Sequence, residues 1–229
     1  MRLSPGWDKT YCSLISNGMN ITWYGHRCVR LEAKEGSVLI DPLDKGLGLR
    51  GPRVNDDIVA FSSPAVPKEV LDQVPERSFV IRGAGEFEVK GIAVRGIQAY
   101  QDTQQGKELG LATIFLIVAD EMTICHLGAL GQDKLTDEQI EAIGDPDILI
   151  VPVGGQSALD PKAAAQLCNQ IEPKIIIPVQ FALPDASYEA EKLDKFVKEI
   201  GLPTEKMDKL RIAKKQLPVD QTRLVVLEA

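Results

Sequence analysis

The chain has 229 residues, 44% of them hydrophobic, and its 26 basic and 33 acidic side chains give a net charge of −7 at pH 7. The acidic excess disfavours nucleic acid and anionic membranes as partners, because neither attracts a negatively charged protein. No apolar run approaches the roughly 18 residues that cross a bilayer, so we expect a soluble globular protein.

The first 18 residues show no hydrophobic periodicity and lack the pattern of a secretory signal. A strand-like run starts at Met19, so we expect residues 1–18 to form an extension before one domain over residues 19–229. The cysteines are widely spaced and mostly lie beside apolar positions, which predicts buried free thiols and a cytoplasmic location. The cysteines are Cys12, Cys28, Cys125 and Cys168.

Short β-rich runs separated by Gly, Asp and Pro turns fill the first two thirds of the chain. Their pattern predicts mostly antiparallel strands. The runs cover residues 20–25, 28–33, 37–42, 57–62, 78–83, 87–97, 111–119 and 122–128.

Helices with clear start and stop signals alternate with strands in the last third of the chain. Thr136 predicts a helix start with Gln139 completing a capping box, and Gly144 predicts its end. Asp160 followed by proline predicts another helix start, and a third helix is expected to end before Gly201. The apolar runs 147–153 and 174–181 predict buried strands, and residues 221–229 a final one.

No clean linker or internal repeat divides the chain. Many strands with helices among the later ones predict a layered α/β fold, in which two sheets pack together and helices cover them. A single domain is the simplest interpretation.

Four segments taken in order resemble the metallo-β-lactamase superfamily. They are residues 21–42, 83–102, 123–155 and 173–181, so the resemblance extends over nearly everything from Met19 onward. Within the superfamily, the chain is similar to the small bacterial Zn-dependent hydrolases that are related to lactonases and phosphodiesterases. The implied fold is the αββα sandwich, with two mixed sheets covered by helices.

The resemblance implies a first metal motif, His-x-His-x-Asp-His, directly after the strand that ends in "DIVAF". In this register, none of the four ligand positions holds the expected residue. They are occupied by Ser63, Ala65, Pro67 and Lys68.

The same comparison places His126 at the next ligand position. The carboxylate expected three residues later is Ala129, the last histidine is replaced by Gln180, and a histidine of the "AYHD" turn is Gln101. His26 matches a position near the site of the family, although not a usual ligand.

Zinc sites ordinarily use at least three protein ligands. Near the expected site, the candidates are His126, Asp102, Asp41 and Cys125, and adjacent strand residues such as the last of these and His126 point to opposite faces. We therefore expect no metal, although the resemblance implies Zn²⁺. We also expect the Lys68 amine to supply the missing positive charge in the cleft.

Three functions remain open on this basis. The first is a non-catalytic binding or assembly protein that has lost the metal motif, in which His26 and His126 are structural and Asp41 shapes a turn or orients His126. The second is a hydrolase of a phosphodiester or lactone, with His126, Asp102 and Lys68 as catalytic residues. The third is a structural subunit of a homo-oligomer. The identity of a small-molecule ligand or protein partner is left open.

Overall fold

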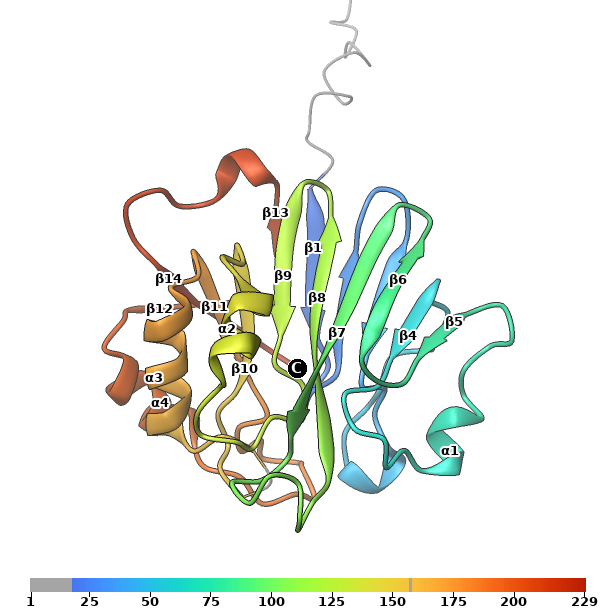
Figure 1. The fold of residues 1–229 in the computed structure, drawn as a ribbon, viewed down its shortest axis with the longest axis horizontal. Coiled ribbons are helices and arrows are strands. Elements are labelled where there is room, and N and C mark those ends of the chain that lie inside the picture. The colour runs from blue at the N-terminus through green and yellow to red at the C-terminus, as the bar shows by residue number, and fades with distance from the viewer. Residues whose placement is uncertain (1–17, 157) are drawn as a thin grey trace, which may run out of the picture.

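The computed structural model describes residues 18–156 and 158–229, so the expectation for the N-terminal extension falls almost wholly outside the described residues. Two mixed sheets stack face to face (Figure 1). This matches the predicted sandwich. No helix in the described ranges has the length and apolar character needed to cross a membrane.

The first sheet has six strands in the order β13-β1-β2-β3-β4-β5. Neighbours from β13 to β3 are antiparallel, whereas β3, β4 and β5 are parallel. The strands are β1 (Met19–Trp23), β2 (Val29–Glu32), β3 (Ser37–Ile40), β4 (Ile58–Ala60), β5 (Phe79–Ile81) and β13 (Leu210–Ile212).

The second sheet has eight strands in the order β12-β14-β11-β10-β9-β8-β7-β6. Strands β6, β7, β8 and β9 form an antiparallel meander. From β9 onward, each neighbouring pair in the order β9, β10, β11, β14, β12 is parallel. The strands are β6 (Gly85–Val89), β7 (Ile92–Tyr100), β8 (Leu111–Ala119), β9 (Met122–His126), β10 (Ile148–Pro152), β11 (Ile175–Val179), β12 (Thr204–Met207) and β14 (Arg223–Leu227).

The helices are fewer than an evenly covered sandwich requires. Figure 1 shows α2, α3 and α4 gathered beside the half of the second sheet that β10, β11, β12 and β14 form. Among the described residues, the six-stranded sheet has only the short α1 near β4 and β5. The described helices are α1 (Lys68–Leu71), α2 (Asp137–Ile143), α3 (Pro161–Ile171) and α4 (Leu193–Ile200), with 3-10 turns at Lys45–Leu47 and Lys214–Gln216.

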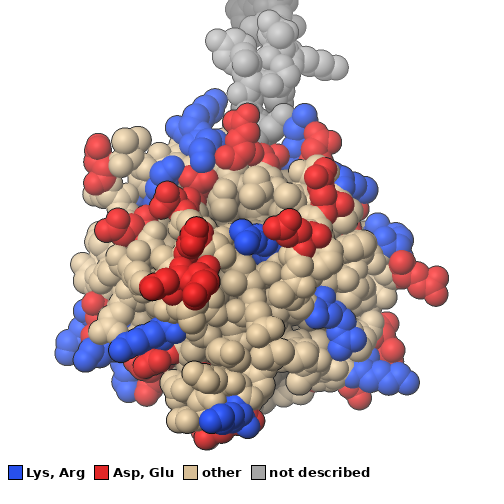
Figure 2. Space-filling view, viewed as in Figure 1, with Lys and Arg blue, Asp and Glu red and all other residues tan. Residues whose placement is uncertain are grey.

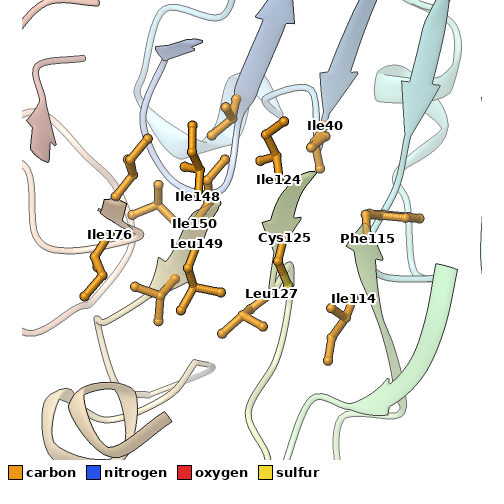
Figure 3. Close-up of a cluster of buried hydrophobic side chains, with 14 of the residues drawn as sticks. Ile40, Ile114, Phe115, Ile124, Cys125, Leu127, Ile148, Leu149, Ile150 and Ile176 are labelled. Atoms are coloured by element: carbon orange, nitrogen blue, oxygen red, sulfur yellow. The ribbon is translucent and has the colours of Figure 1, made fainter. Parts of the chain in front are cut away.

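Alternation along the strands builds two cores. In β3 and β4, Ile40 and Ile58 face the large core between the sheets, whereas Leu39 and Val59 face a smaller cluster on the other side of the first sheet. Figure 3 shows part of the large core, with side chains of β8, β9, β10 and β11 and, from the first sheet, Ile40. The two clusters fix β4 from both faces, so the residues directly after it are held at a defined place.

The three cysteines within the described residues are free and buried, as predicted. Burial raises the pKa of each thiol, so none of the three is poised as a nucleophile. Cys12 lies outside the described residues.

Candidate functional site

The candidate site lies where several strands of both sheets end. Asp41 follows β3, Ser62 follows β4, His126 ends β9 and Gln180 follows β11. Within each sheet, the strands concerned run parallel, so their carboxyl ends share an edge. This edge is the usual place for a site in a sheet of this kind.

Asp41 is the centre of a hydrogen-bond cluster. One carboxylate oxygen accepts from the backbone N–H of Ser62 at 2.7 Å. The other accepts from Ser62 Oγ and, at 3.2 Å, from Arg27 Nε. The Arg27 and Asp41 side chains are only 16% and 10% exposed, so the ion pair is largely removed from water.

Arg27 extends this cluster to the second sheet. Its Nη1 donates to Gln180 Oε1 at 3.4 Å, and Gln180 is itself buried. The backbone N–H of Gln180 donates to the carbonyl of His26 at 2.9 Å. Sequence comparison missed Arg27, because it is not a metal-ligand type. The available signal was a cation immediately after a histidine of the matching segment.

His126 is fully buried, and both of its ring nitrogens are used by the backbone. Nδ1 accepts from the N–H of Gly128 at 2.9 Å, so the proton lies on Nε2, which donates to the Arg27 carbonyl at 3.2 Å. Gly128 has φ 61°, and a Cβ there would lie 2.3 Å from that of Ser62. Only glycine can therefore make this contact with the imidazole.

Both histidines are held neutral. Burial, opposed by the charge of Asp41, lowers the pKa of His126 to about 4. Burial and then the charge of Arg27 lower the pKa of His26 to about 3. The His26 ring packs edge-on against Tyr188 with centroids 4.9 Å apart. These contacts fit the expected structural role better than acid/base catalysis near neutral pH.

We expect acid to destabilise the protein well above the range in which carboxylates titrate. Unfolded histidine takes up a proton near pH 6.5, whereas folded His126 stays neutral until about pH 4. The contribution of neutral His126 to the free energy of unfolding is therefore complete above about pH 6.5, and it decreases as the pH falls toward about 4. Linkage gives a loss of roughly 2 kcal/mol for this residue at about pH 5. Urea unfolding of the parent chain and of His126→Asn at several pH values measures the difference.

The expected convergence of Lys68, Asp102 and His126 is not found. Lys68 is exposed at the first residue of α1, and no hydrogen bond or ion pair of its side chain to His126 or Asp102 occurs among the described residues. The positive charge bound to Asp41 comes from Arg27 instead. Lys68 does not line the cavity beside Asp41, so the cation expected there is Arg27 and not Lys68.

Asp102 organises a neighbouring loop. Its carboxylate accepts backbone N–H groups from Gln104, Gly106, Glu108 and Leu109 at 2.7 to 3.1 Å. These backbone bonds, the one from Leu109 first, hold the pKa of Asp102 below its ordinary value. A carboxylate engaged in this way is a loop anchor, and it shares no described contact with His126.

The other substituted ligand positions have ordinary structural roles. Ser63 Oγ accepts from Ala65 N at 3.2 Å and from Gln101 Nε2 at 3.1 Å. Pro67 precedes α1, and Ala129 is fully buried.

A cavity of about 240 Å³ remains above the cluster. Its polar lining comes from His26, Arg27, Asp41, Asp44 and Ser63. Apolar side chains make up much of the rest, among them Leu43, Leu47, Phe61, Val66 and Val70. The cleft can hold a small ligand with an apolar body and a polar group directed toward the ion pair.

The donor set of the cleft does not fit a metal ion. Within residues 18–156 and 158–229, no three His, Cys, Asp or Glu side chains are grouped so as to hold one. Asp41 is paired with Arg27, and both nitrogens of His126 are engaged. Three protein ligands are the usual minimum for zinc.

Comparison with known proteins gives a consistent result. A model of the beta-lactamase superfamily domain matches residues 20–180. A UPF0173 metal-dependent hydrolase of Methanopyrus kandleri is 24% identical over 82% of this chain and 95% of its own length.

Solved structures agree with the family match. A proposed zinc-dependent hydrolase of the metallo-beta-lactamase superfamily from Thermotoga maritima is 28% identical. The alignment covers 91% of this chain and 98% of that one, with a TM-score of 0.75. A metallo-beta-lactamase fold protein of Bacillus subtilis, 10% identical over 92% of this chain and 97% of that one, matches with a TM-score of 0.57 and supports the fold alone.

Proposed function

The chain belongs to the metallo-β-lactamase superfamily, and we propose that it is a member without a catalytic metal, acting as a binding or assembly protein. Relatives are named metal-dependent hydrolases, so a metal is expected of the family. The observation that carries the proposal is His126, the one residue kept from the family's ligand set. Its two nitrogens are committed to Gly128 and Arg27, which leaves no lone pair for a metal.

The cavity supports ligand binding as the role that remains. It is lined by a polar ion pair on one side and by apolar side chains on the other. This composition suits a small molecule of mixed character. The alternative of a hydrolase with a rearranged site has weaker support, because His126, Asp102 and Lys68 have separate surroundings.

The proposal includes a cytoplasmic protein without nucleic-acid partners. The three described cysteines are free thiols, which suits a reducing compartment. Figure 2 shows basic and acidic side chains intermixed on the face that it displays, without a continuous basic surface there. Together with the net charge of −7, this gives phosphate backbones little attraction.

Activity assays test the proposal. The purified chain, supplied with Zn²⁺ or Mn²⁺, is expected to hydrolyse neither a chromogenic phosphodiester nor a lactone. Turnover abolished by chelation would reject the proposal. Metal-independent turnover that disappears in His126→Gln would favour the rearranged hydrolase.

Chelation is also expected to leave stability unchanged. A metal present at about a hundred times its Kd stabilises a fold by about 2.7 kcal/mol, so its removal would lower the melting temperature measurably. We expect the melting curve of the freshly purified chain to be the same before and after dialysis against EDTA. A fall that added zinc reverses would show a resident metal.

A further inference from the structure

We propose that the guanidinium group of Arg27 is the resident cation of the cleft, standing where the metal-dependent relatives hold their metal. This inference rests on the proposed absence of a catalytic metal. It concerns what has taken the place of the metal, and why the cleft keeps its shape without one.

The position of Arg27 is the first support. Its side chain binds Asp41 at the end of β3 and Gln180 at the end of β11, so one cation joins the two sheets at the site edge. Gln180 stands at the position of the last histidine ligand in the family register. The amide oxygen of glutamine accepts from a guanidinium, and it is not among the usual ligands of zinc.

The backbone of Arg27 is the second support. Its carbonyl accepts the Nε2 proton of His126, the remaining histidine of the ligand set. Arg27 therefore contacts two positions that the family resemblance assigns to metal ligands, Gln180 through its side chain and His126 through its backbone carbonyl. A planar guanidinium with fixed donors is well suited to such a role.

Backbone conformation is the third support. His26, Asp41 and Gln180 have φ values of 48°, 46° and 56°, in the left-handed region that L-residues seldom adopt. Such conformations persist only where the surroundings hold them. The side chain of Arg27 bonds Asp41 and Gln180. The carbonyl of His26 accepts from the backbone N–H of Gln180. The guanidinium thus bonds the side chains of two of these three residues, as a metal would bond its ligands.

Charge repulsion opposes the binding of a metal ion beside the guanidinium of Arg27. Two like unit charges about 4 Å apart repel by about 4 kcal/mol in a partly buried site, and a divalent ion doubles this. Arg27 would therefore oppose a metal even if the missing ligands were returned.

Rebuilt ligand sets test this point. One chain carries the family's ligands and keeps Arg27, and a second also carries Arg27→Ser. A third keeps Arg27 and carries Arg30→Ser as the matched control, because Arg30 is equally exposed at 16% and pairs with Asp56 away from the ligand positions. The shared substitutions are Ser63→His, Ala65→His, Pro67→Asp, Lys68→His, Ala129→Asp and Gln180→His.

The zinc affinities of the three chains are compared by competition with a chromogenic chelator. Circular dichroism first checks that each chain is folded. We expect the chain with Arg27→Ser to bind zinc at least about a hundredfold more tightly than the other two. Equal affinity with and without Arg27 overturns the inference, as does a folded Arg27→Ser chain that binds no zinc. Zinc in the parent chain overturns the proposed function instead.

A second measurement needs only one substitution, so it decides the matter if the rebuilt chains fail to fold. Arg27→Ala is expected to lower the melting temperature, and low-millimolar guanidinium chloride is expected to raise it again by filling the vacated place. The same concentration of sodium chloride should not restore it, and the parent chain should gain nothing. An Arg27→Ala chain that guanidinium does not stabilise overturns the inference.

Discussion

Asp41→Ala is expected to lower the free energy of unfolding by about 3 to 5 kcal/mol, the range found when one partner of a buried ion pair is removed. The change leaves Arg27 without its carboxylate and the backbone N–H and hydroxyl of Ser62 without their acceptor. Alanine also tolerates the φ of 46° poorly. Both effects act in the same direction.

Urea unfolding at pH 7 measures this loss, with two reference variants. Asp41→Asn keeps an acceptor for Ser62 and tolerates the backbone conformation, so a smaller loss is expected. Asp44→Ala removes a nearby carboxylate that accepts from the N–H of Gly46 and so caps a short turn, and we expect a loss of about 1 kcal/mol. If Asp41→Ala and Asp44→Ala cost the same, Asp41 is not the centre of the cluster.

Asp147→Ala is expected to have the next largest effect, about 3 kcal/mol. This carboxylate is 4% exposed and accepts from Lys174, Lys214 and the backbone of Thr123 at 2.7 to 3.0 Å. It joins β10 to the turn that follows β13, so it ties the second sheet to the first. Hydrogen bonds to charged groups contribute about 1.5 to 3 kcal/mol each, and the half-exposed lysines reduce the total.

The pH dependence of this variant gives a second check. Burial would raise the pKa of Asp147, but the hydrogen bonds from the two lysines more than offset this and hold it below its ordinary value. The contribution is therefore present above about pH 4 and is lost as the pH falls through the lower folded pKa. Unfolding of the parent and variant should converge in acid. The exposed neighbour Asp145, changed to alanine, should shift stability by less than about 0.5 kcal/mol.

Much of the fold was predictable, because local patterns and packing agree. The capping box of Thr136 and Gln139 and the cap of Asp160 start helices where the sequence predicts them. β12 escaped notice because its residues Thr204–Met207 are mostly exposed at a sheet edge and show no apolar alternation. The short β13 gives too few residues for a period to be read. Helix cover over the first sheet was overestimated, since α1 is the only α-helix beside it in the part of the chain that the structure describes.

The site was only half predictable. The alignment with the family placed Ser63, His126 and Gln180 at one edge of the sheets. Such a placement requires only that the order of the strands is known. The partners could not be read in the same way, because Arg27 and Gln180 meet across 153 residues of chain. Asp102 was expected in the cleft because of the family resemblance, but both of its carboxylate oxygens accept from backbone N–H groups of the loop that follows it. Which donor reaches a carboxylate first depends on loop conformation.

The metal content of the protein as purified tests the central claim most directly. The chain should be prepared without chelators and without metal-charged resin, and then measured by plasma mass spectrometry. An arginine that occupies the metal's place and a histidine with no free nitrogen predict zinc and manganese far below one ion per chain. Stoichiometric zinc or manganese that remains through dialysis would contradict this account.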